Sequence, residues 1–253
     1  MRIALFLIAS IVLIGGAFAF TSPFPQPLEY HDFADKRTFV GIPHACNVVS
    51  NLPFVLVGLW GIIQLLHNAS RSPARFTHAY ERIPFWAYFI GLALTGIGSA
   101  YYHADPNNQR LVWDRLPLTI AFMGLFTSVL AERIDIRLAK WLLGPLILAG
   151  MASVLYWDHT ERIGAGDLRF YFVVQFYPLL ALIALIVLFR PRYTLTSDLI
   201  GSLAAYGVAK LTEALDERIY AAAVFVSGHT IKHLVAGLGA YLILRMIQKR
   251  CPI

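Results

Sequence analysis

The sequence predicts an all-α, polytopic membrane protein: a seven-helix transmembrane bundle preceded by one further apolar segment. Two observations lead to this prediction. Hydrophobic residues make up 58% of the 253 residues, charged residues only 14%, and the mean hydropathy is +0.62. Soluble domains carry about 25% charged residues. In addition, the apolar residues are gathered in runs close to the roughly 20 residues that a membrane-crossing helix needs.

Eight apolar runs follow one another along the chain, and each is ended by charged residues or by segments with Pro or Gly. They cover residues 3–20, 47–66, 83–102, 111–130, 138–156, 170–189, 195–215 and 229–247. None alternates apolar and polar residues as a membrane β-strand would. A helix satisfies its own backbone hydrogen bonds within the lipid, so we expect helices. The last seven runs form one predicted seven-helix transmembrane domain at 47–248, followed by a cytoplasmic tail at 249–253.

The first run admits two interpretations. Met1 and Arg2 precede an apolar stretch that ends in Ala17-Phe18-Ala19. This pattern is typical of a cleaved secretory signal peptide, and it equally suits an additional transmembrane helix. Residues 1–20 are therefore a signal peptide or an extra helix, and both interpretations place the segment 21–46 on the outer side of the membrane.

The distribution of charge between the predicted loops gives an orientation. Alternate loops are basic, and they carry Arg71, Arg75, Arg82, Arg133, Arg137, Lys140, Arg190 and Arg192, while the tail adds Arg245, Lys249 and Arg250. The other loops carry the acids Asp105, Asp158, Glu161, Asp167, Glu213, Asp216 and Glu217. Short basic loops stay in the cytoplasm, so the C-terminus is predicted to be cytoplasmic. The net charge of +6 thus reports topology, and we expect no nucleic-acid partner.

Three histidines have the spacing and depth of a metal site. His229 and His233 are four residues apart at the start of the seventh core helix, so both imidazoles can reach one ion. His103 ends the second core helix, and the predicted orientation puts it at the same membrane face. Three imidazoles that leave one position open are typical of catalytic zinc. The remaining histidines, His31, His44, His67, His78 and His159, are predicted to be capping or interfacial residues.

Two further polar residues lie at the depth of these histidines. Asp114 begins the third core helix, where a carboxylate could take a proton from a water whose pKa a zinc ion lowers. Ser99 precedes His103 by one helical turn and could donate a hydrogen bond to a developing oxyanion, although small residues also serve helix packing. Lys210 and Glu213 have the spacing of an ordinary helix-end ion pair.

Several motifs together resemble the alkaline ceramidases. The stretch GSAYYHA at 98–104, then Asp114, and the stretch GHTIKHL at 228–234 are similar to the S-x-x-x-H, Asp and H-x-x-x-H motifs of that family. The stretch NVVSN at 47–51 resembles the polar start of the family's first helix. The likeness extends from about residue 47 to residue 241. The wider superfamily of seven-helix hydrolases includes the adiponectin/progestin-type receptors.

This resemblance implies a function. A family member would bind Zn²⁺ through His103, His229 and His233, use Asp114 on the water and Ser99 beside it, and hydrolyse the amide of a ceramide-like lipid to a fatty acid and a sphingoid-type amine. Eukaryotic members also have an acidic calcium site with a Glu three residues before the Asn. His44 occupies that place here, so the calcium site is not carried over. The additional N-terminal run suggests a bacterial-type member in an inner membrane.

Two other functions compete with hydrolysis. A receptor-like protein of the same fold would keep the metal with little turnover, but the inner loops here are short and basic. A transporter could use intramembrane His and Asp residues as a relay, but no pair of interrupted helices marks a midplane site. The expected partner is a lipid substrate, and the sequence does not indicate an oligomeric state.

Overall fold

Helices make up most of the part of the chain that the computed structural model describes, residues 2–71 and 75–253. The long helices are α1 (Arg2–Ala19), α3 (Leu52–Arg71), α4 (Arg82–Ala104), α5 (Asn108–Arg133), α6 (Ile136–Arg162), α7 (Arg169–Leu188), α8 (Thr196–Ala214) and α10 (Gly228–Lys249). The short ones are η1 (Leu28–His31), α2 (Ala45–Val49), η3 (Ala79–Glu81) and α9 (Asp216–Ala223). Each predicted run corresponds to one long helix, which confirms the all-α membrane fold. The Arg71 side chain lies outside the described part.

Within the described part of the chain, seven helices are long and apolar enough to cross a membrane: α1, α2 with α3, η3 with α4, α5, α6, α7 and α10. The chain is therefore an integral, multi-pass membrane protein. The sixth core helix predicted from the sequence, α8, is equally long but more polar. Asp198 near its start pairs with Arg245 of α10, and Glu213 near its end pairs with Lys232 of α10. Pairing with a neighbouring helix lets these charges lie inside the bundle.

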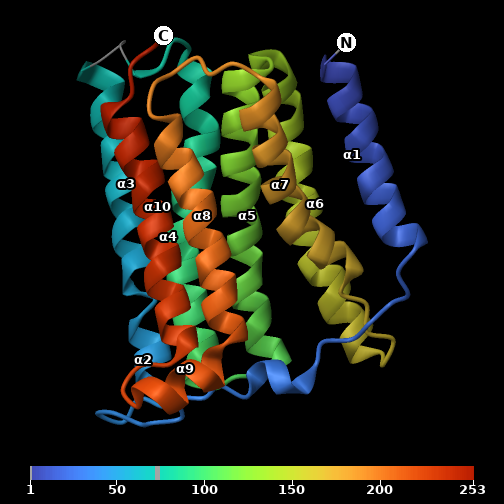
Figure 1. Ribbon diagram of the computed structural model, residues 1–253, viewed down its shortest axis with the longest axis vertical. Coiled ribbons are helices and arrows are strands. Elements are labelled where there is room, and N and C mark those ends of the chain that lie inside the picture. Colours follow the sequence, from blue (N-terminus) through green and yellow to red (C-terminus); the bar gives the residue numbers. More distant parts are fainter. Residues whose placement is uncertain (1, 72–74) are drawn as a thin grey trace.

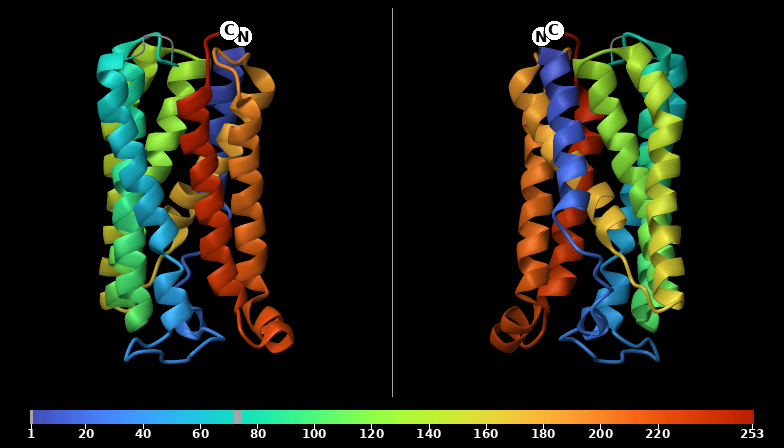
Figure 2. Two further views of the ribbon diagram at one scale, coloured as in Figure 1. Left: turned by 90° about the vertical axis from the view of Figure 1, so that its left-hand side faces the viewer. Right: turned by 90° about the vertical axis from the view of Figure 1, so that its right-hand side faces the viewer.

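The core helices stand side by side in a bundle, with α1 against its edge (Figures 1 and 2). α1 packs on α7, where Phe6 meets Phe189 edge to face at 6.2 Å. Packing is tightest between α4 and α5. A side chain at Gly98 would lie 2.0 Å from the Trp113 carbonyl oxygen, so only glycine permits this approach next to the predicted site residues.

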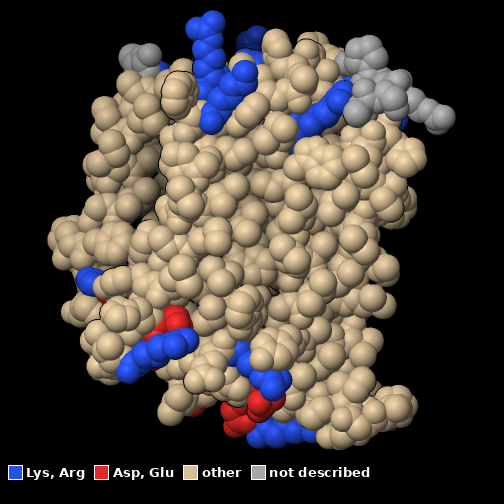
Figure 3. Space-filling model, turned by 180° about the vertical axis from the view of Figure 1, so that it is seen from behind, with Lys and Arg blue, Asp and Glu red and all other residues tan. Residues whose placement is uncertain are grey.

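The two ends of the bundle differ. One end, which we call the terminal end, holds both chain termini, and the other, the site end, holds α2, α9 and η1 (Figure 1). Figure 3 shows Lys and Arg side chains at the terminal end, acids and bases together at the site end, and a broad band of uncharged surface between them. Such a band is the surface that a lipid bilayer covers. α9, lying across the site end, was not expected from the sequence.

Candidate metal centre and active site

The three predicted ligands meet at the site end. His103 lies in the last turn of α4, and His229 and His233 lie in the first turns of α10. All three side chains are at least 97% buried, and each offers a ring nitrogen within 4.8 Å of the others. Ser227 fixes the start of α10 because its hydroxyl accepts a hydrogen bond from the Thr230 amide at 3.1 Å. The i, i+4 spacing then turns both α10 imidazoles toward α4.

The hydrogen bonds of His233 decide which of its nitrogens is free. Its Nδ1 lies 2.8 Å from the Ser50 hydroxyl, and that hydroxyl donates to the Asn47 carbonyl at 3.0 Å. Since a hydroxyl has one proton, Ser50 must accept from His233 Nδ1–H. The proton is therefore on Nδ1, and Nε2 carries the lone pair that a metal requires. Partners of this kind orient the histidine ligands of metal sites.

The other two imidazoles also fit a metal ion. The Nε2 atoms of His103 and His229 lie 3.2 Å apart. Two nitrogens bound to one tetrahedral zinc lie about 3.3 Å apart when the Zn–N bonds are about 2.0–2.1 Å long. His103 Nδ1 is buried and has no hydrogen-bond partner among the described residues. These donors are imidazoles at zinc-like spacing, so the residues fit the ion that the resemblance implies.

The two predicted catalytic residues lie beside this cluster. Ser99 interacts with the carboxylate of Asp114, and both line the same cavity as His233. Ser99 is one turn before His103 on α4, and Asp114 is in the second turn of α5. The close approach of α4 and α5 at Gly98 therefore brings the serine and the carboxylate together. All five site residues predicted from the sequence are gathered in one place.

The segment before α2 that contains Phe33 and Ala34 covers the imidazoles, and we call it the roof. The ring of Phe33 is 4% exposed, and its centroid lies 4.6 Å from that of His103 and 4.4 Å from that of His229. Asp216 fastens this roof to α10, because its carboxylate accepts from the amides of Ala34 at 3.0 Å and His229 at 2.7 Å. This segment therefore covers the rings of His103 and His229 at the site end.

The histidine nearest the roof, His31, has a hydrogen-bonded position rather than a free interfacial one. Its ring nitrogens lie 2.8 Å from the Tyr102 hydroxyl and 2.8 Å from the Asn108 side-chain oxygen. Burial lowers the pKa of His31, so the neutral ring donates to Asn108 and accepts from Tyr102. His44 stands at the N-cap position of α2, but its side chain does not cap the helix, and its Nδ1 lies 3.0 Å from the Asp35 carbonyl oxygen.

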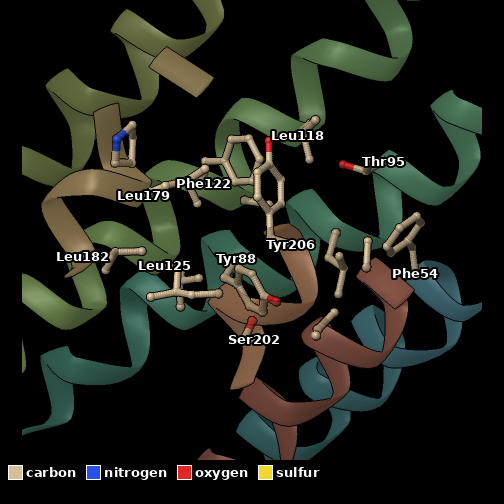
Figure 4. A pocket seen from close by; sticks show the side chains of 17 residues that line it. Phe54, Tyr88, Thr95, Leu118, Phe122, Leu125, Leu179, Leu182, Ser202 and Tyr206 are labelled. Atoms are coloured by element: carbon tan, nitrogen blue, oxygen red, sulfur yellow. The ribbon is translucent and has the colours of Figure 1, made fainter. Parts of the chain in front are cut away.

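An apolar cavity leads from this site into the bundle. The part next to the imidazoles, about 90 Å³, is lined by Ser99, Asp114 and His233, and it shares Phe54 and Tyr206 with a deeper part of about 110 Å³. Figure 4 shows the deeper part, with Leu179 and Leu182 of α7 on one side, Phe54 of α3 on the other, and Tyr206 of α8 between them. The cavity is thus polar where it meets the histidines and apolar beyond.

Sequence reasoning missed several residues at the site. Ser50 belongs to a polar stretch that the sequence had marked only by resemblance. Phe33 gave no signal, because nothing in a loop sequence indicates which aromatic ring covers a site. Lys210 and Glu213 form the predicted ion pair, but both line the cavity together with Lys232.

The chain matches the family "Ceramidase" over residues 40–212. The matched range includes Ser99, His103 and Asp114, and it ends before His229 and His233. No curated protein matches the chain. A match over this much of the chain shows the family: the protein is a member of the ceramidase family.

Proposed function

We propose that the protein is a zinc-dependent amide hydrolase of the membrane that cleaves a ceramide-like lipid into a fatty acid and a sphingoid-type amine. The observation that carries the proposal is the position of three converging, buried imidazoles at the polar end of an apolar cavity. A lipid amide suits such a site, because its acyl chain is apolar and its carbonyl is polar. Family membership supports the same reaction class.

The proposed reaction assigns each residue a step. Zinc held by His103, His229 and His233 would supply Lewis-acid chemistry, polarising the amide carbonyl and lowering the pKa of water. The Asp114 carboxylate takes a proton from the attacking water and passes it to the amide nitrogen. A C–O bond forms as the C–N bond breaks, and the products are a carboxylate and an amine. The Ser99 hydroxyl orients Asp114 by donating to its carboxylate, and once Asp114 holds the proton from the water, the same hydroxyl donates instead to the carbonyl oxygen as negative charge develops there.

The cavity also supports a lipid substrate by its position between α7 and α8. These helices are consecutive in the sequence, but among the described residues they make few close backbone contacts. Pro178, Leu179 and Leu182 of α7 and Ser202, Leu203 and Tyr206 of α8 line the deeper cavity. We infer that the acyl chain enters there directly from the bilayer, with its carbonyl directed toward Ser99 and Asp114.

The charge pattern supports an orientation for this reaction. The basic residues of the terminal end favour the cytoplasmic side, so the site end would face the outside of a bacterial inner membrane. A reporter fused to the C-terminus tests this orientation independently of activity. A cytoplasm-active reporter should give signal there, and an exported reporter should not.

The hydrolysis proposal is tested with the purified full-length protein. We expect about one zinc ion per chain, release of free fatty acid from a ceramide-like amide, and loss of that release on treatment with a chelator. His233→Ala should lose the zinc and the activity together. His159→Ala is the matched control, because His159 is exposed in the last turn of α6.

Two results would contradict the proposal. One is purified protein without zinc whose hydrolysis is unaffected by chelator. The other is His233→Ala protein that remains folded and as active as the His159→Ala control. Specific lipid binding without any fatty-acid release would instead favour the receptor-like alternative.

A further inference from the structure

A second charged group lines the cavity next to the histidines. Glu213 of α8 pairs through one carboxylate oxygen with Lys210 and through the other with Lys232 of α10, the latter at 2.6 Å. Lys232 Nζ also lies 3.1 Å from His229 Nε2. All three side chains line the same space as Asp114. We call Lys210, Glu213 and Lys232 the lysine–glutamate group.

The charges that line this cavity balance before any metal ion is counted. The cations are Lys210 and Lys232, and the carboxylates are Glu213 and Asp114. A divalent ion at the histidines would add two positive charges that these two carboxylates do not offset. Uncompensated charge is costly inside a bilayer.

Arg115 lies behind the wall of the cavity. Its side chain is 5% exposed and donates to the Gln26 side-chain oxygen at 2.6 Å. Its guanidinium lies 4.4 Å from the centroid of Tyr171 and 5.6 Å from that of Tyr30, and both tyrosines line the cavity. Cation–π contacts stabilise a guanidinium without neutralising it, so Arg115 adds positive charge behind this wall.

Lys232 also keeps hydrogen-bond donors for a ligand. An ammonium has three donors, and Glu213 takes one of them. The contact with His229 Nε2 needs the lone pair that this nitrogen would give to a metal, so it cannot persist with the ion bound. In the loaded protein Lys232 therefore presents a free donor next to the metal ligands.

The depth of the lysine–glutamate group decides which half of the substrate it would meet. Along α8 the cavity wall runs from Ser202 through Tyr206 to Lys210 and Glu213, and along α10 it runs in the opposite sense to Lys232. The apolar part thus lies on one side of the reaction site and the lysine–glutamate group at the polar end. With the acyl chain in the apolar part, the amine half of a lipid amide lies against the lysines.

We propose that the amine half of the substrate carries an anionic group, a carboxylate or a phosphate, bound by Lys210 and Lys232. The ceramide-like substrate of the proposed function would then carry a carboxylate or a phosphate on its amine half in place of a neutral headgroup. This inference rests on the proposed function only for the direction of the substrate in the cavity.

Binding of inert analogues tests the inference without turnover. In long-chain ketones with CH₂ in place of the amide NH, there is no C–N bond to break. Three such ketones, equal in chain length and ending in a carboxylate, a phosphate or a hydroxyl, are titrated against the zinc-loaded protein, and dissociation constants are taken from the shift in thermal unfolding. We expect at least one anionic ketone to bind roughly tenfold or more tightly than the hydroxyl ketone, as for charge-assisted hydrogen bonds.

Substitutions of the two lysines test whether they cause the tighter binding of the anionic ketones. Lys210→Met and Lys232→Met should each remove most of the preference for the anion, and Lys210→Arg should retain part of it. In each single variant Glu213 still pairs with the remaining lysine, so we expect the protein to fold. The midpoint of thermal unfolding without ligand checks that it does. Lys249→Met, at the opposite end of α10, is the matched control and should leave the preference unchanged.

The possible failures are distinct. If the hydroxyl ketone binds as tightly as both anionic ketones, or if Lys210→Met and Lys249→Met behave alike, the inference is wrong even when ceramides are hydrolysed. If an anionic ketone binds with the expected preference but no lipid amide is cleaved, the proposed function is wrong and the anion site remains.

Discussion

Both ends of the bundle bury charged side chains, and the way these are arranged differs. At the terminal end, Arg250 is 1% exposed, pairs with Glu132, and lies 4.1 Å from the ring centroid of Tyr193 and 4.5 Å from that of Phe76. The neighbouring hollow that Glu132 lines is only about 10 Å³. The side chains of this cluster pack against one another with little free volume, and they hold the C-terminal tail against the bundle.

At the site end the buried groups face one another across a cavity. The Nε2 atoms of His103 and His229 lie 3.2 Å apart. Asp114 and Lys232 border open space rather than packed rings. Buried charge alone therefore does not identify a functional site in this protein. Convergence of lone pairs and charges on a cavity does, because such groups gain their stabilisation from a ligand.

The largest expected effect comes from a substitution that removes the proposed chemistry of the site end and leaves its packing unchanged. Asp114→Asn keeps the size and a hydrogen-bond acceptor for Ser99 but removes the proton acceptor. We expect the rate of lipid-amide hydrolysis to fall by roughly 10²–10⁴-fold and the unfolding temperature to change little. Asp105→Asn, an exposed position, is the control. Equal rates for the two variants would remove Asp114 from the reaction.

The second prediction concerns the buried ion pair at the terminal end. Glu132→Gln leaves the buried Arg250 without its anion, which should reduce the free energy of unfolding by about 3–5 kcal/mol, measured by thermal or denaturant unfolding. Hydrolysis per folded molecule should stay unchanged. The double variant Glu132→Gln/Arg250→Met should be more stable than Glu132→Gln alone. Loss of activity in the folded variant would show that the two ends are coupled.

The third prediction concerns the hydrogen bond that selects the His233 tautomer. Ser50→Ala removes the acceptor of His233 Nδ1–H, so the dissociation constant for zinc should rise about 10–100-fold in a competition with a chelator. Ser50→Thr should restore most of the affinity. Ser153→Ala, a buried serine that donates to the Gly150 carbonyl on α6, is the control. If the Ser50→Ala and Ser153→Ala proteins bind zinc equally well, Ser50 does not position the ligand.

The smallest effect tests whether the site end also contains purely structural pairs. Arg37 holds the pKa of Asp35 below its usual range through two hydrogen bonds. The unfolded chain therefore binds the proton more readily, and the pair stabilises the fold above about pH 4, the ordinary value. This contribution disappears as the pH falls through the lower folded value.

The Asp35 contribution is measured as the difference in unfolding temperature between wild type and Asp35→Asn. It should correspond to about 1 kcal/mol at most, because Arg37 is half-exposed, and it should vanish in strong acid. Asp32→Asn, in an exposed pair with Lys36, is the control variant. A difference that persists at low pH would mean that Asp35 acts through packing rather than charge.

Much of the site could be predicted because depth in a membrane is readable from sequence. A helix rises 1.5 Å per residue, so the distance of His103, Asp114 or His233 from the end of an apolar run gives its depth. The i, i+4 spacing of His229 and His233 gives their common face. The sidedness of the loops follows from Lys and Arg counts. The all-α bundle and the group of five site residues rest on these local rules.

The sequence by itself thus determined the helices, their lengths, and the depth at which chemistry-bearing residues gather. Only the tertiary structure decided what surrounds them: the hydroxyl of Ser50 behind His233, the ring of Phe33 over the imidazoles, and the side of α10 on which Lys232 meets Glu213. Depth is set by each helix alone, through its length and its fit to the bilayer. Neighbours are set by the rotation and packing of several helices together, here through the close approach at Gly98, and no single segment encodes that.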